Sequence, residues 1–163
     1  MLLVATLLIS TNPEMIVRRP RIILAVATAF LKLLLAVRGA TELSVTVYDG
    51  PKDCGASDKV KPWDHIEMHY VGTIDASSEA GTPHQKIDSS RDRGETFGFQ
   101  IGGGNVIDGW DEGIVGLCKG AKANLVIPPA LAYDDKGVGD GEIIPPGATV
   151  SGPVFGFAHA CSG

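Results

Sequence analysis

The sequence lacks most of the short motifs that mark common catalytic chemistry. Its three cysteines include no Cys-x-x-Cys pair, which disfavours zinc ribbons and thioredoxin-like redox sites. No Gly-x-Ser-x-Gly motif of a serine hydrolase occurs. The run Gly102-Gly103-Gly104 lacks the dinucleotide-binding pattern, and no Lys-Ser/Thr follows it as in a phosphate-binding loop. The sequence therefore carries no signature of hydrolytic, thiol-redox or nucleotide-dependent chemistry.

Positive charge is scarce beyond residue 40. Residues 1–40 hold five Lys or Arg and one acid, whereas the remaining 123 residues hold nine basic and eighteen acidic side chains, a net charge of −9. Such a surface repels phosphate backbones, so we expect no nucleic-acid partner. Residues 41–163 are enough for one domain with one modest core.

The first forty residues differ in composition from the rest. Three arginines precede the apolar run Ile22–Val37, and small residues follow it at Gly39 and Ala40. This pattern predicts a secretory signal peptide over residues 1–40, with no membrane span left after cleavage. The alternative is a retained membrane anchor, but a run of about 16 residues that contains Lys32 is short for a bilayer-spanning helix. A second apolar patch near the start indicates an overextended gene start or a two-part targeting signal.

Residue patterns beyond Thr41 predict mostly strands. Residues 65–74 alternate polar and apolar side chains, which places Ile66, Met68 and Tyr70 on one face. Apolar residues at helical spacing predict one helix over residues 106–117. Further strands are expected at residues 43–48, 96–101, 121–127 and 149–157, the last one broken by Gly152 and Pro153, with loops at 75–85 and 134–142. This order, without alternating βαβ units, predicts an α+β domain with an antiparallel sheet.

Three polar residues on the other face of the 65–74 strand allow two interpretations. His65, Glu67 and His69 could together bind zinc. They are equally well explained as solvated positions opposite a buried face, since the sequence offers no further groups to support a metal. We therefore predict no metal site.

The segment 86–110 is the strongest candidate for a binding pocket. It holds one isolated acid, Asp88, followed by several large apolar residues, among them Phe97, Phe99 and Trp110. A small apolar cup with one polar group is the usual construction of small-molecule and peptide pockets. The alternative is plain core filling, which is the interpretation that we keep for Phe99.

Three short sequence motifs resemble those of a known family. IDSSRDR, VIDGWDEGI and IIPPGAT, in this order and at nearly the same spacing, resemble the FKBP-type peptidyl-prolyl cis-trans isomerases, and the resemblance covers residues 43–149. It implies a five- to six-stranded antiparallel sheet wrapped around one short helix, forming a domain over residues 41–163. It also implies a peptidyl-prolyl isomerase that needs no cofactor and binds proline-containing polypeptides and the macrolide inhibitors of the family. We expect a monomer. The alternative is a binding or chaperone module with the same fold and little activity.

The resemblance also implies roles for individual residues. Trp110 would form the floor beneath the proline ring, and Tyr133 would donate its hydroxyl to the substrate carbonyl. Asp88 would lie at the rim of the pocket near Tyr70 and Arg93. Further walls and the flap would come from Ile87, Phe97, Val106, Ile107, Ile143, Ile144 and, with the last strand realigned, Phe155.

Two positions depart from the family pattern. Ile87 stands where the family usually has Phe, which makes one wall smaller. Asp134 follows Tyr133 where the family commonly has Gly, and the loop after it is longer and more acidic. Together with the irregular last strand, these departures favour the alternative of a binding module.

The surroundings of two cysteines resemble one branch of the family. Cys54 and Cys118 lie in segments similar to the secretory-pathway branch, found in the endoplasmic reticulum lumen, which carries a disulfide at these places. The resemblance implies the same disulfide here, with two free thiols as the alternative, and leaves Cys161 without a partner. We expect a protein of the endoplasmic reticulum lumen or a secreted one; another organelle lumen or a membrane-anchored form is the alternative.

Overall fold

The structure of this protein is a computed structural model, and it describes residues 41–159. The predicted signal peptide over residues 1–40 and Cys161, which was expected to have no partner, lie outside the described residues. Within the described range, no helix is long and apolar enough to cross a membrane.

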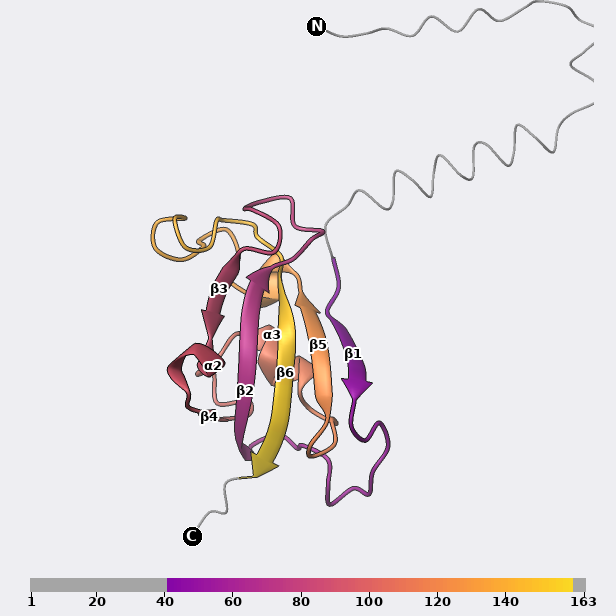
Figure 1. Cartoon of the computed structure of the whole chain (residues 1–163). Coiled ribbons are helices and arrows are strands. Elements are labelled where there is room, and N and C mark those ends of the chain that lie inside the picture. Colours follow the sequence, from indigo (N-terminus) through magenta and orange to yellow (C-terminus); the bar gives the residue numbers. More distant parts are fainter. Residues whose placement is uncertain (1–40, 160–163) are drawn as a thin grey trace, which may run out of the picture. The chain divides into compact units, whose positions relative to one another are not determined.

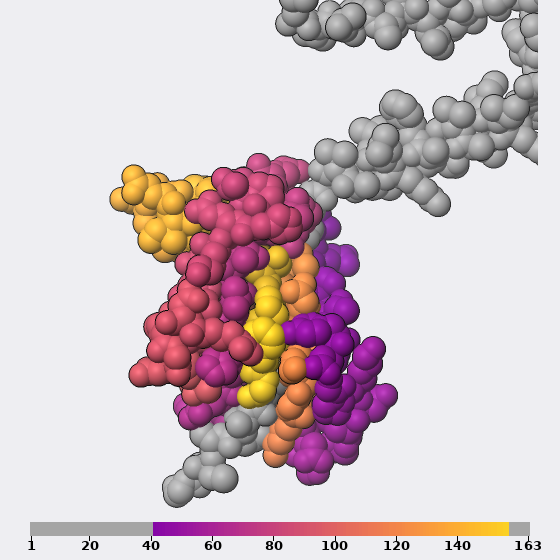
Figure 2. Space-filling view, in the orientation of Figure 1, coloured from indigo at the N-terminus to yellow at the C-terminus, as the bar shows by residue number. Residues whose placement is uncertain are grey.

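The described residues form a six-stranded antiparallel sheet with short helices (Figure 1). The strand order is β1-β5-β6-β2-β3, and β4 pairs with β2 beyond the end of β3. Figure 2 shows β6 in yellow, lying between β5 in orange and β2 in magenta. The predicted α+β class with an antiparallel sheet is confirmed. The elements are β1 Ser44–Asp49, β2 His65–Ile74, β3 Lys86–Ser89, α2 Ser90–Arg93, β4 Phe97–Gln100, α3 Asp108–Gly113, β5 Lys122–Ile127, η2 Pro129–Leu131 and β6 Val150–His159.

Alternation along β2 determines which face of the sheet is buried. Ile66, Met68, Tyr70 and Ile74 are buried, as the sequence pattern predicts, whereas His65 and Glu67 between them are exposed. In β5 the buried residues alternate in the same way. The inner faces of these strands pack against α3, and the core therefore lies between the helix and the sheet.

Helix α3 is shorter than the sequence predicts. It spans only Asp108–Gly113 instead of residues 106–117, so Val106 and Ile107 precede it, Val106 in a bend and Ile107 in an extended conformation. Three glycines in the predicted span weaken it, because glycine is less favourable in a helix than alanine by about 1 kcal/mol. One of them, Gly116, has φ 84°, which ends any helical path. Because α3 begins only at Asp108, Val106 and Ile107 lie outside the helix, and both line the cavity described below.

Strand β6 is continuous, although the sequence predicts a break at Gly152 and Pro153. It pairs with β5 from Val150 to Phe155 and with β2 on its other edge. Gly152 is required there because a Cβ atom at this position would overlap the carbonyl oxygen of Val71 on β2. The glycine therefore marks a close approach of two strand backbones, which is one of the known reasons for glycine inside a strand.

Candidate functional site

A cavity of about 490 Å³ lies between α3 and the inner face of the sheet. Its volume is within the usual range for small-molecule sites. Most of the site residues that the sequence predicts lie around this cavity. The predicted residues that line it are Tyr70, Ile87, Asp88, Phe97, Val106, Ile107, Trp110 and Tyr133.

Aromatic rings surround Trp110, which projects from the first turn of α3. The ring of Tyr70 lies edge-on to the indole at 4.9 Å, and that of Phe97 lies edge-on at 6.0 Å, both measured between ring centroids. Phe99 stacks on the indole at 5.9 Å and is only 4% exposed, so it belongs to the core, as expected. These contacts fix the orientation of the indole, because edge-to-face and offset-stacked pairs are the favoured aromatic geometries.

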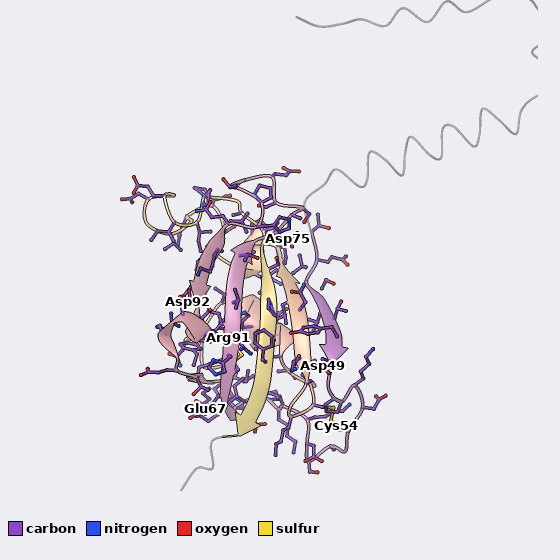
Figure 3. All side chains as sticks on the ribbon, in the orientation of Figure 1. Asp49, Cys54, Glu67, Asp75, Arg91 and Asp92 are labelled. Carbon is purple, nitrogen blue, oxygen red and sulfur yellow. A yellow bond between two sulfur atoms is a disulfide. The ribbon has the colours of Figure 1, made fainter. Side chains whose placement is uncertain are left out.

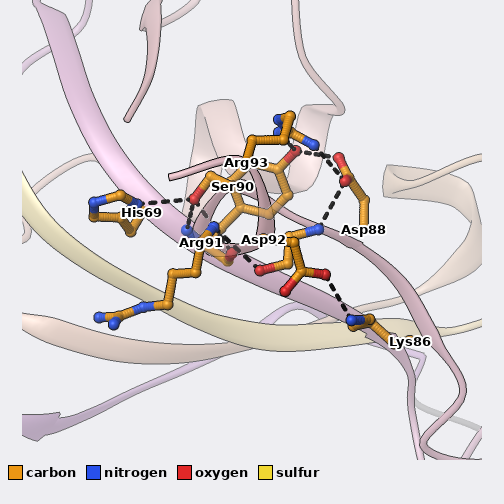
Figure 4. Close-up of polar contacts among 9 residues, drawn as sticks. His69, Lys86, Asp88, Ser90, Arg91, Asp92 and Arg93 are labelled. Carbon is orange, nitrogen blue, oxygen red and sulfur yellow. Dashed lines mark hydrogen bonds and ion pairs between the residues drawn. The ribbon is translucent and has the colours of Figure 1, made fainter. Parts of the chain in front are cut away.

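Tyr70 and Asp88 line the cavity and form a polar cluster with Arg93. Figure 4 shows Asp88 and Arg93 among their polar contacts. The Tyr70 hydroxyl donates a hydrogen bond to the Asp88 carboxylate and accepts one of 2.9 Å from Arg93. The other carboxylate oxygen accepts from Arg93 at 2.5 Å and from the Ser89 amide at 2.7 Å. The carboxylate of Asp88 is thus held in one orientation by three donors.

The hydrogen bonds of this cluster shift the pKa values of its members. The Tyr70 hydroxyl lowers the pKa of Asp88, with Arg93 and the Ser89 amide acting in the same direction against desolvation. Burial raises the pKa of Tyr70, and the hydrogen bond to Asp88 raises it further. Asp88 is therefore a stable carboxylate and Tyr70 a neutral phenol at neutral pH.

The one-turn helix α2 positions Arg93 beside Asp88. The Ser89 side chain caps its start by accepting from the Arg91 amide, and Gly94 ends it in a left-handed conformation with φ 73°. Ser90 is fully buried and accepts a 2.9 Å hydrogen bond from the Tyr70 amide, which ties α2 to β2. This local turn explains why an arginine five residues after Asp88 can return to its carboxylate.

Tyr133 brings a second hydroxyl to the cavity, from the chain after η2. Its ring is half-buried, and burial raises its pKa, as does the negative charge of Asp88. Within residues 41–159 the Tyr133 hydroxyl has no hydrogen-bond partner, so it is free to donate to a ligand. The next residue, Asp134, has φ 50°, a conformation in which glycine is the least strained residue.

Four predicted site residues do not line the cavity: Arg93, which binds the Asp88 carboxylate, and Ile143, Ile144 and Phe155. Ile144 is 1% exposed and packs in the core, where its carbonyl accepts from the Val138 amide, whereas Ile143 is 50% exposed. Phe155 lies on the outer face of β6, where the guanidinium of Arg91 (labelled in Figure 3) stands 4.4 Å from its ring centroid. Phe155 is therefore not a wall of this cavity, because alternation along β6 directs Val154 and not Phe155 inward.

Several cavity residues were not predicted from the sequence. Leu125 and Ile127 come from β5, and Gly72, Gly152 and Pro153 come from the paired strands β2 and β6. Alternation in the 121–127 strand could have indicated the two apolar residues. The glycines carry no such signal, since a residue without a side chain shows its place only through the register of the sheet.

Two of the three polar residues on the outer face of β2 form hydrogen bonds with neighbouring side chains. His69 forms a 3.1 Å hydrogen bond with the Ser90 hydroxyl, and Glu67 accepts one of 3.1 Å from Thr96. Within residues 41–159, no group of three or more His, Cys, Asp or Glu side chains is arranged to bind a metal ion.

Comparison with known proteins agrees with this geometry. The family model for FKBP-type peptidyl-prolyl cis-trans isomerases matches residues 56–151. FK506-binding protein 2 of Dictyostelium discoideum is 39% identical over 118 residues, which cover 72% of this chain and 82% of that protein. The protein of the same name from Debaryomyces hansenii is 43% identical over 110 residues, covering 68% and 76%. The crystal structure of AtFKBP13 matches with a TM-score of 0.60 and 31% identity, over 76% of this chain and 98% of that one.

Proposed function

Because the chain belongs to the FKBP-type peptidyl-prolyl cis-trans isomerases and is therefore a peptidyl-prolyl isomerase, we propose that the cavity over Trp110 is the site of the reaction. The observation that carries this proposal is the combination of an indole floor, a fixed carboxylate and an unpaired tyrosine hydroxyl around one hollow.

Prolyl isomerisation makes limited demands on a protein. The X–Pro bond must rotate through a state without amide resonance, across a barrier of about 18–20 kcal/mol. No covalent bond breaks, so no nucleophile or cofactor is needed. An acceleration of about 10⁴-fold corresponds to roughly 5.5 kcal/mol of preferential stabilisation of the twisted state. An apolar enclosure and one well-placed hydrogen bond are enough to supply effects of this size.

The residues around the cavity suit these demands. Trp110 offers a flat rigid surface for the proline ring, between Tyr70 and Phe97. The free hydroxyl of Tyr133 is the donor that we assign to the substrate carbonyl. Asp88, held by Tyr70 and Arg93, places a carboxylate of fixed orientation at the edge of the cavity. The twisted X–Pro bond is less charge-separated than the planar amide. The apolar walls therefore favour the twisted state over the planar one.

The proposal also includes the cellular compartment of the protein and the inhibitors that it binds. The structure contains a disulfide between Cys54 and Cys118, and disulfides persist in oxidising compartments. We infer that residues 1–40 direct residues 41–163 to the secretory pathway, where the isomerase acts as a monomer on exported proteins. The relatives are named FK506-binding proteins, and we propose that this cavity also binds such macrolides.

A pair of tyrosine variants tests the proposed site. Tyr133→Phe removes only the hydroxyl, and we expect kcat/KM for a short X–Pro peptide to fall about tenfold in a protease-coupled assay. The matched control is Tyr48→Phe, because Tyr48 is half-exposed on β1 and does not line the cavity. The proposed site is wrong if Tyr133→Phe retains full activity, and the enzymatic function is wrong if the folded protein never exceeds the uncatalysed rate.

A further inference from the structure

The inner wall of the cavity lacks side chains at one pair of facing residues. The register of β2 and β6 runs unbroken from Tyr70 opposite Val154 to Ile74 opposite Val150, which places Gly72 opposite Gly152. Gly72 also faces Asp88 on β3, and Gly152 faces Leu125 on β5. One row across the sheet therefore reads Asp88, Gly72, Gly152, Leu125, and its two central members carry no side chain.

The space beside Gly72 is open, whereas Gly152 lies close to the backbone of β2. A Cβ atom added at Gly72 would meet only the carbonyl oxygen of Asp88, at 3.8 Å, and nothing else within 4 Å. At Gly152 no Cβ can be accommodated, because it would overlap the Val71 carbonyl oxygen. The neighbouring rows do carry side chains, those of Tyr70 and Val154 on one side. The glycine pair is thus a notch of one residue row in the cavity wall, and both glycines line the cavity.

The surroundings of the notch determine what it can hold. Leu125, Val150 and Val154 line the cavity beside it, and all three are buried apolar side chains. At its other end lies Asp88, whose carboxylate oxygens already accept hydrogen bonds from Tyr70, Arg93 and Ser89. The notch therefore offers apolar contact without a free donor, which suits an uncharged apolar group.

We propose that the Gly72–Gly152 notch is a subsite for an apolar group attached to the ring that lies on Trp110. The ligand class is cyclic amides of the proline type that carry an added apolar substituent of about the size of a phenyl group. The proposal rests on the proposed function in taking Trp110 as the place of the ring. The new element is that the two glycines leave room for a substituent that larger residues at these positions would exclude.

Two small ligands test the subsite in the folded protein. N-acetyl-proline methylamide and its 4-phenyl derivative are titrated by calorimetry, which measures binding whether or not the protein is an active isomerase. Burial of a phenyl group predicts that the derivative binds at least about tenfold more tightly to the unchanged protein. A ratio of dissociation constants near one would overturn the proposal.

Variants locate the effect at the notch. Gly72→Val places a branched side chain in the open space, and the ratio of the two dissociation constants should fall from about ten to about one. Gly98→Val is the matched control, because Gly98 lies in strand β4, is exposed, and would place its Cβ no closer than 3.6 Å to any neighbour. The control should keep the ratio of the unchanged protein, and an unchanged ratio in Gly72→Val would refute the assignment.

A smaller substitution and a second measurement keep the two proposals separate. If Gly72→Val does not fold, Gly72→Ala fills less of the notch and should still lower the ratio by several fold. Isomerase activity on a plain Ala-Pro peptide is measured in parallel on the unchanged protein. Full activity without preference for the phenyl derivative refutes the subsite alone, whereas absent activity refutes the proposed function.

Discussion

At the scale of single residues, the charges around the cavity predict a flat pH profile. Asp88 has a lowered pKa, because the Tyr70 hydroxyl and Arg93 stabilise its charge, while burial raises the pKa of Tyr70 and Tyr133. Between about pH 5 and about pH 9 these three groups keep one protonation state. We expect kcat/KM on an X–Pro peptide to be constant over this range, and a titration with a midpoint near pH 7 would contradict the assigned residues.

The lowered pKa of Asp88 also has a consequence for stability. A carboxyl group whose pKa is lower in the folded state contributes stability above its unfolded value of 3.8, and this contribution is lost as the pH falls through the folded pKa. Asp88→Asn should therefore unfold more easily than the unchanged protein at pH 6, and the difference should shrink below about pH 3.8. Urea denaturation at several pH values measures it, with Asp92→Asn on the exposed side of α2 as the control. A difference that stays constant down to pH 2 would contradict this prediction.

Single residues also show how far the sequence could predict the site. Tyr70, Phe97 and Trp110 could be assigned to the pocket because they are large aromatic residues in or near motifs that resemble those of the family. Phe155 was misplaced, since its direction depends on the phase of alternation in β6, which two irregular residues obscured. Gly72 could not be assigned at all. It shapes the cavity wall by lacking a side chain, and this becomes visible only when β2 and β6 are paired.

At the scale of elements, the distance between α3 and the sheet depends on glycine. A Cβ atom at Gly109 would overlap the Cγ2 atom of Ile127 on β5, and one at Gly113 would meet Leu125 at 3.0 Å. Gly109→Ala would gain about 1 kcal/mol of helix propensity but should lose more, since overpacking a core costs about 1–3 kcal/mol. We expect a net loss of stability of about 1 kcal/mol, measured by chemical denaturation.

The control for this substitution is Gly98→Ala. Its Cβ would have only ordinary contacts in β4, so it should change stability by less than Gly109→Ala does. A Gly109→Ala variant more stable than the unchanged protein would show that α3 can move away from β5 without penalty. Because Trp110 belongs to α3 and lines the cavity, such a movement would carry the indole with it and alter ligand affinity.

Elements were predicted unequally well from the sequence. Strand β2 followed from alternation, because one face of it is buried and the other is not, and β5 was expected from its strand-like residues. The length of α3 did not follow, since apolar spacing indicates which residues are buried but not whether they belong to a helix or to extended chain beside it. The one-turn helix α2 was not predicted, because four residues give too little periodicity for any pattern.

At the scale of the whole molecule, one covalent link connects two distant parts of the described chain. The disulfide joins Cys54, in the irregular segment before β2 (labelled in Figure 3), to Cys118, which is buried in the core just before β5. The backbone reinforces the link, since Val60 and Leu117 form a 2.9 Å hydrogen bond and Lys59 pairs with Cys118. The irregular segment between β1 and β2 is thus fastened to the domain by both kinds of bond.

Removing this link should lower the stability of the whole domain. The two cysteines are 64 residues apart, and in the chain-entropy model closing such a loop stabilises the folded state by roughly 4 kcal/mol. For a domain of this size we expect the Cys54→Ala/Cys118→Ala variant to melt at least about 10 °C below the unchanged protein. Reductant should lower the melting temperature of the unchanged protein towards that of the variant and leave the variant itself unaffected. Cys161→Ala serves as the matched control, because this cysteine is not part of the bond. Equal melting temperatures for the oxidised protein and the double variant would mean that burial of Cys118 and the neighbouring backbone hydrogen bonds, and not the covalent link, hold the segment in place.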